Sequence, residues 1–123
     1  MTEPSASYPY IVTPAIPVVG VYNAVTGQIV ATLPGAIYNR LLTGVTISAT
    51  VASRADLYFS FIDNSNRFDT TPQGSQNTAD YSGGPRHILS NTPIVVVWSQ
   101  PGGGLIPASP TPTASATFFL ARA

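Results

Sequence analysis

His87 is the one histidine in this sequence of 123 residues, so any catalytic triad would have to be built on it. Ser82 or Ser90 would supply the nucleophile, and Asp80 the acid that orients the imidazole. The sequence contains no G-x-S-x-G elbow that would expose such a serine. A single histidine beside a turn is common in proteins that have no triad. We therefore expect His87 to be a structural or surface residue, and the protein not to be an enzyme.

The acidic residues suggest a metal site or a glycosidase pair, but neither pattern is complete. Asp63, Ser65 and Asp69 offer oxygen ligands at a spacing that loosely resembles a calcium loop. Arginine occupies position 67, however, and the glycine and closing glutamate of an EF-hand are missing. Asp63 and Asp80 could flank a glycosidic bond as acid and base, yet neither lies in a hydrophobic stretch. We expect local Asx-turns here, with no metal and no cofactor.

Aromatic residues offer a third kind of site, a platform on which sugar rings stack. The candidates are Tyr58, Phe68, Tyr81 and Trp98. Trp98 lies in an all-apolar stretch and is expected in the core. Phe68 and Tyr81 remain, and with Arg67 they are the possible contact residues of the polar segment DNSNRFDTTPQGSQNTADYSGGP, Asp63 to Pro85. We interpret this segment as a long exposed connection between two sheets, whose side chains face solvent or a neighbouring subunit.

The composition narrows the class of protein. Only ten residues are charged, five of each sign, so there is no basic surface for nucleic acid. The absence of cysteine excludes disulfides and thiolate metal sites. No run of about 18 apolar residues could span a bilayer, and the first residues do not resemble a secretory signal, so we expect synthesis in a cytoplasm and no membrane partner. So little charge on a soluble chain favours an assembled state, such as a homo-oligomer.

The N-terminal segment, residues 1–17, is expected to be an extended arm. Its four prolines, at positions 4, 9, 14 and 17, fix φ and remove backbone donors, which excludes a helix. It has too many apolar residues for an inert linker. We expect the arm to dock on a partner through Tyr8, Tyr10, Ile11 and Ile16.

The remaining residues, 18–123, are predicted to form a single all-β domain. From Val45 to Val51, apolar residues alternate with Thr and Ser, as in a half-buried strand. Residues 57–61 repeat the alternation, so residues 52–55 should connect two antiparallel neighbours. VVGVY and QIVATL flank a turn at Gly27, and IVVVWS has the apolar character of a central strand. Seven to eight such strands predict an antiparallel β-sandwich or jelly roll with an extended N-terminal arm.

Four stretches of the sequence resemble a known class of proteins. They are YNRLLTGVTISATV, LYFSFIDNSNRFDTTPQGSQNTADY, ILSNTPIVVVWSQPGGG and ATFFLARA, which together span residues 38–123. They are similar to the small β-sandwich virion proteins of tailed bacteriophages of actinobacterial hosts, most clearly in NTADYSGGP and SNTPIVVVWSQPGGG.

This resemblance implies an accessory structural protein of the virion, without catalytic residues. Our leading hypothesis is a decoration (cement) protein on the phage head, oligomeric, which binds the major capsid protein or other virion subunits through its arm and reinforces their contacts. The alternative hypothesis is a tail or fibre module that recognises a host surface glycan through Phe68, Tyr81 and the neighbouring loops.

Overall fold

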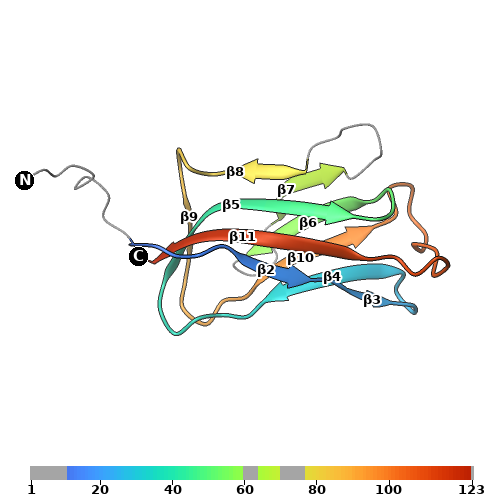
Figure 1. Ribbon diagram of the computed structural model, residues 1–123, viewed down its shortest axis with the longest axis horizontal. Coiled ribbons are helices and arrows are strands. Elements are labelled where there is room, and N and C mark those ends of the chain that lie inside the picture. The colour runs from blue at the N-terminus through green and yellow to red at the C-terminus, as the bar shows by residue number, and fades with distance from the viewer. Residues whose placement is uncertain (1–10, 60–63, 70–76, 123) are drawn as a thin grey trace, which may run out of the picture.

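The computed structural model consists of two antiparallel sheets packed face to face (Figure 1). It describes residues 11–59, 64–69 and 77–122, with the backbone alone described for 11–12 and 64–69. These residues contain no helix. The predicted all-β sandwich is therefore confirmed.

Sheet A is built around two long strands, β5 (Arg40–Ala49) and β11 (Ala114–Arg122), which pair along their whole length. Four short strands complete it, β1 (Ile11–Val12) and β2 (Ile16–Val19) beside β11, and β8 (Thr78–Asp80) and β9 (Arg86–Ile88) beside β5. Each outer edge of sheet A is thus an interrupted strand.

Sheet B has five strands and is centred on β10 (Ile94–Ser99). In spatial order they are β3 (Val21–Asn23), β4 (Gln28–Leu33), β10, β6 (Arg54–Phe59) and β7 (Asn64–Asp69). β10 pairs with β4 on one side and with β6 on the other. This confirms that IVVVWS is a central strand.

The strand pairing is that of a jelly roll. From the outside inwards, β2 pairs with β11, β4 with β10, β5 with β8 and β9, and β6 with β7. Such nested pairs arise when one long hairpin is wrapped into two sheets. β3 adds a ninth strand position at the edge of sheet B, while β1 continues the edge formed by β2.

The β3–β4 hairpin forms as its sequence predicts. Gly27 has a φ of 68°, the left-handed conformation that glycine adopts without strain. Its N–H donates to the carbonyl of Asn23 at 2.7 Å, and the Asn23 side chain accepts the N–H of Val25 at 2.8 Å. The carbonyl of Gly27 accepts the N–H of Ile106 at 3.0 Å, which holds the long loop after β10 against the hairpin.

The expected hairpin between β5 and β6 is wrong, because these strands belong to different sheets. The chain crosses from sheet A to sheet B through residues 50–53, and both neighbours of β5 come from distant parts of the sequence. Alternation specifies which face of a strand is buried, and leaves its partner undetermined.

The expected domain boundary at residue 17 also needs correction, since it falls inside β2. Residues 16–19 pair with 115–118 of β11, and the N–H of Gly20 donates to the carbonyl of Ala114 at 2.8 Å. A Cβ atom at Gly20 would lie 2.5 Å from the Ile29 side chain. Only glycine fits where the chain turns from sheet A into sheet B.

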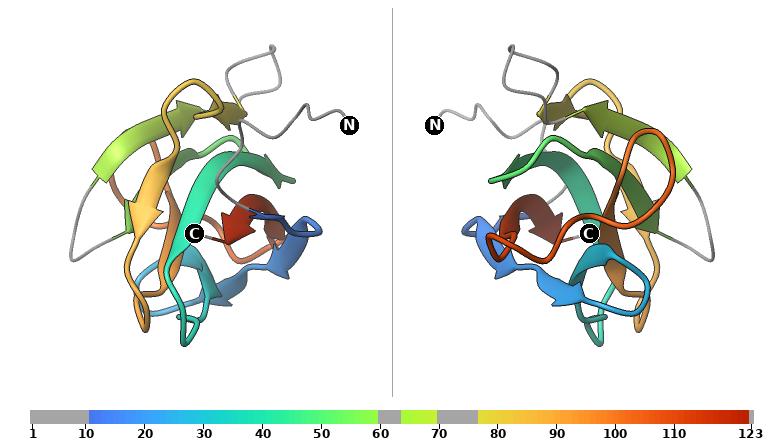
Figure 2. Two further views of the ribbon diagram at one scale, coloured as in Figure 1. Left: turned by 90° about the vertical axis from the view of Figure 1, so that its left-hand side faces the viewer. Right: turned by 90° about the vertical axis from the view of Figure 1, so that its right-hand side faces the viewer.

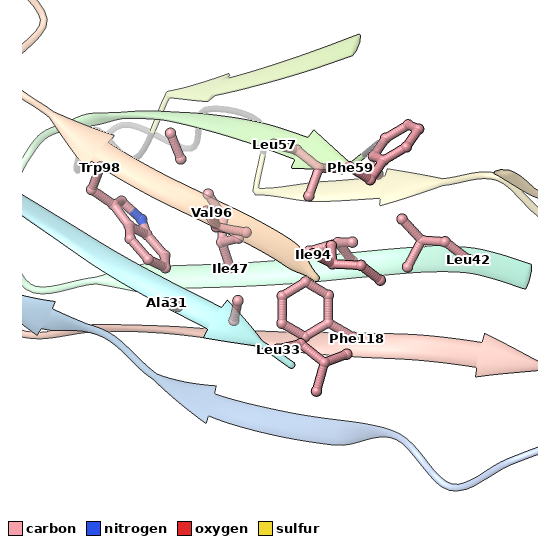
Figure 3. Packing of buried hydrophobic residues seen from close by; sticks show 14 of the residues in the cluster. Ala31, Leu33, Leu42, Ile47, Leu57, Phe59, Ile94, Val96, Trp98 and Phe118 are labelled. Atoms are coloured by element: carbon pink, nitrogen blue, oxygen red, sulfur yellow. The ribbon is translucent and has the colours of Figure 1, made fainter. Parts of the chain in front are cut away.

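The interior is filled by apolar side chains from both sheets, which meet between β5 and β11 on one side and β4, β6 and β10 on the other (Figure 3). Trp98 and Phe118 are the largest residues with no exposed surface. With no cysteine in the chain, this packing holds the two sheets together.

Replacing Trp98 by alanine should lower the free energy of unfolding by about 3–5 kcal/mol, because it leaves a large cavity between the sheets. Urea denaturation followed by circular dichroism measures this loss. Val25→Ala is the control, since this side chain is exposed and its loss should change stability by less than about 0.5 kcal/mol. A loss under about 1 kcal/mol for Trp98→Ala would show that the indole is not part of the core.

Gly27→Ala should destabilise the domain by at least about 1–2 kcal/mol, the cost of a left-handed conformation for an L-residue. The new methyl group would also lie 2.5 Å from the Cα atom of Leu105. Gly102→Ala is a matched control, since a Cβ atom there meets nothing within 4 Å. Equal melting temperatures for the two variants would contradict this account of the hairpin.

Candidate functional site

The predicted docking arm is in part a piece of sheet A. Ile11 belongs to β1 and lies opposite Arg122 of β11. Ile16 belongs to β2 and lies opposite Phe118 of the same strand. Between these strands, the backbone N–H and the hydroxyl of Thr13 both donate to the carbonyl of Leu120, at 3.2 and 3.0 Å. Ile11 and Ile16 therefore belong to the domain. The prolines of this segment do not prevent the pairing, because an edge strand tolerates proline where the missing donor would face solvent.

The other two residues expected in the arm, Tyr8 and Tyr10, lie outside the described residues. Their docking role stays a prediction. It now applies to residues 1–10 alone, because the chain enters the sheet at Ile11.

The polar segment Asp63 to Pro85 includes two strands and contributes to both sheets. β7 lies at the edge of sheet B, where the backbones of Arg67 and Phe68 are opposite Asp56 and Ala55. β8 lies beside β5 in sheet A. The segment does connect two sheets, as expected, but much of it is paired rather than a free loop.

Tyr81 is not the exposed contact residue that the sequence suggested. Its side chain is only 7% exposed and belongs to the core cluster. The guanidinium of Arg86 lies over its ring, 4.8 Å from the centroid. The alternation of Ala79 and Tyr81, both buried, carried this information within an otherwise polar stretch.

The residues of the hypothetical triad are not brought together. Asp80 lies opposite Gly44 on β5 and His87 opposite Leu41, which separates them by roughly 10 Å along the strand. The Asp80 carboxylate instead accepts the backbone N–H of Ser82 at 2.9 Å. In the part of the chain that the structure describes, no three His, Cys, Asp or Glu residues gather to hold a metal ion.

The charged residues lie mainly on one side of the sandwich. Strands β6 to β9 carry six of them: Arg54, Asp56, Arg67, Asp69, Asp80 and Arg86. β7 forms the edge of sheet B away from β3, with β6 next to it, and β8 and β9 form the edge of sheet A away from β2 (Figure 2). Two others, Arg40 and Arg122, face each other across β5 and β11 at one end of sheet A.

Among the residues that the structure describes, the opposite side carries no charged residue. It consists of residues 16–33, which form β2, β3 and β4, and we call it the charge-free side. Val19, Val21 and Val25 are 74%, 70% and 86% exposed on it. Leu105 is also exposed, beside Gly27 of the hairpin. Apolar side chains that gather at the surface mark a contact with another molecule.

The outer face of sheet A carries a ladder of hydroxyl groups. Thr46 lies opposite Thr117 and Ser48 opposite Ser115, with the two serine hydroxyls 3.0 Å apart. The hydroxyl of Thr50 accepts the N–H of Thr113 at 2.9 Å. The hydroxyls of Ser48, Ser115 and Thr50 already have hydrogen-bond partners across β5 and β11 or just beyond their ends, so this polar face has fewer groups that need a partner from outside.

The sequence does hold a signal for this ladder. Residues 46–50 and 113–117 share the pattern T-x-S-x-T, and the antiparallel register matches the two copies residue for residue. The charge-free side has a local signal in part, because residues 16–33 contain no charged residue. The sequence does not show that its two edge strands and Leu105 come together in the fold.

Arg40 is buried at one end of sheet A, with 5% of its surface exposed. Its Nη2 donates to the carbonyl of Thr92 at 2.9 Å, while its Nε has no partner. The pKa of Arg40 is lowered from its usual value, because burial disfavours the charged guanidinium and the nearby Tyr38 offsets only part of this effect. The ring of Tyr38 also lies under Arg122, 4.3 Å from the guanidinium. These contacts tie the corner before β10 to the ends of β5 and β11.

Comparisons of the chain with protein-family models, with curated proteins and with solved structures gave no match. Among the described residues, no helix has the length and apolar character needed to cross a membrane.

Asp80→Asn should change the pH dependence of stability in the acid range. The hydrogen bond from the Ser82 N–H lowers the pKa of Asp80 below its usual value. A lowered folded-state pKa stabilises the protein above the unfolded-state pKa, and this contribution is lost as the pH falls through the folded-state value. The difference between the variant and the original chain should therefore shrink as the pH falls below about 4. A carboxylate NMR titration that finds no lowered Asp80 pKa would contradict this.

Proposed function

We propose that this chain is a non-enzymatic structural protein of a bacteriophage virion, a decoration protein docked on the head that stabilises contacts between capsid subunits. The observation that carries the proposal is the charge-free side, where three valines are exposed and no ionic group is present. A protein that remains a free monomer normally disperses charge over its surface. This distribution favours a protein that functions in an assembly.

The virion is proposed as that assembly on two grounds. Jelly rolls occur in viral capsid domains as well as in lectins and cupins, so the fold by itself is an analogy. The resemblance of residues 38–123 to small phage virion proteins favours the first of these classes.

Residues 1–10 are the proposed contact with the major capsid protein. They precede β1, which lies at the edge of sheet A opposite the end of β11. Ten extended residues span at most about 33–36 Å, enough to reach across a neighbouring subunit. Tyr8 and Tyr10 supply apolar surface, and Pro4 and Pro9 limit the conformational entropy lost on docking.

Glycan recognition by a tail or fibre module is less well supported. Of the aromatic residues considered for a sugar platform, Trp98 and Tyr81 are both buried. This leaves Tyr58, which is half-buried on β6, and Phe68 on the neighbouring strand β7, two of the four residues that the hypothesis named.

Phage particles made without this chain should be less resistant to heat and to osmotic shock, and purified chain added back should restore their resistance. The variant Tyr8→Ser with Tyr10→Ser should restore it poorly, because the arm then lacks its two aromatic anchors. Particle survival and the amount of chain bound per particle are the two measurements.

The matched control is Ser5→Ala with Ser7→Ala, which alters the same arm without removing its aromatic rings and should bind normally. Absence of the chain from purified particles, judged by mass spectrometry, would overturn the proposal. Location on the tail together with binding to a glycan array would favour the recognition module instead.

A further inference from the structure

We propose that two copies of this chain associate through their charge-free sides, with Val19 and Val21 at the centre of the contact. This deepens the proposed function and rests on it in one respect, because it assigns the surface through which neighbouring decoration subunits meet. The occupant of this surface is a second copy of the chain.

The first argument is electrostatic. A charged group that is buried against a surface without a counter-charge loses its hydration and gains no ion pair. Residues 16–33 offer no counter-charge, so a partner that brings an acid or a base to this side would be penalised. The same side of a second copy brings none. Two-fold contacts place one patch against itself, and a neutral patch is compatible with that geometry.

The second argument is the shape of the apolar surface. Val19 and Val21 flank Gly20, so their Cα atoms are within about 7 Å of each other. Val19 lies opposite Ser115 on the outer face of sheet A, and Val21 lies opposite Val30 in sheet B. The two valines therefore stand on either side of the corner where β2 passes into β3. A second copy packed on this corner removes both side chains from water.

The third argument comes from the sheet edges. Proteins protect exposed edges against pairing with charged residues, prolines and interruptions. β7 contains Arg67 and Asp69, and the edge formed by β8 and β9 is interrupted and contains Asp80 and Arg86. The edge formed by β1 and β2 is interrupted too and contains Pro17, but it has no charged residue, and β3 has neither charge nor proline. The two edges that no charged residue protects therefore lie on the charge-free side.

A hollow of about 400 Å³ borders the proposed contact. Val19 forms one wall, and the rest is lined by hydroxyl residues of the ladder, including Ser48 and Ser115, and by Ala49 and Ala114. The Ser48 and Ser115 hydroxyls bond to each other, so covering them leaves fewer polar groups unsatisfied. The hollow can thus accept an apolar side chain of the second copy without a large desolvation penalty.

Sedimentation equilibrium of the purified full chain tests the proposal. The original chain should form a dimer that dissociates on dilution. Val19→Asp and Val21→Asp should each raise the dimer Kd by at least about tenfold, because each places an unpaired carboxylate in the contact. Leu89→Asp is the matched control, since Leu89 is 57% exposed next to β9 on the charged side, and its Kd should stay within about twofold of the original.

Val19→Thr and Val21→Thr guard against a failure to fold, because threonine has nearly the shape of valine and keeps the strand conformation. Each should weaken the dimer while melting at nearly the original temperature. A chain that is monomeric at every concentration overturns the inference, as does a dimer that survives both aspartate variants or weakens equally with Leu89→Asp. Such a result leaves the proposed function intact if the chain is found in virions, whereas a dimer absent from virions overturns only the function.

Discussion

The rest of this structure depends on one constraint. Each of the three central strands, β5, β10 and β11, must bury one row of apolar side chains between the sheets. The chain has no disulfide to cross-link its sheets, and few ion pairs are available to so few charged residues. Trp98 from sheet B and Phe118 from sheet A fill the space between the sheets. The jelly-roll pairing is consistent with this packing, because wrapping one long hairpin brings the apolar face of sheet A against the apolar face of sheet B.

The local part of this architecture could be read from the sequence. Alternation at Val45 to Val51, the glycine of the β3–β4 hairpin and the apolar run around Trp98 each specify a local conformation or a buried face. The partners of each strand could not be read, since β5 pairs with β11 some 70 residues later. Pairing at such separation is decided by the whole core, and for this reason the β5–β6 hairpin was wrong and Ile11 and Ile16 joined the sheet.

In the candidate site, too, local features could be predicted from the sequence and features that depend on strand pairing could not. The polar neighbours of Tyr81 predict an exposed loop, yet its alternation with Ala79 matches the buried position that its ring takes in the core. The charge-free side depends on topology still more. β2 and β3 become edges of two different sheets because the chain turns at Gly20, where a larger side chain would collide with Ile29. The lack of charge in residues 16–33 can be read from the sequence, whereas the exposure of Val19 and Val21 at neighbouring edges is a property of the fold.

The arm precedes β1, at the same edge of sheet A that carries part of the charge-free side, and this position connects capsid docking with the dimer contact. β1 and β2 run along the same edge of β11, so residues 1–10 emerge from the edge that also carries Val19. A subunit that anchors its arm on the capsid would then hold this edge in a fixed direction. Two subunits so oriented lose less rotational freedom when their neutral sides meet, which raises their effective concentration for each other. A weak contact in solution would therefore become a strong one on the particle.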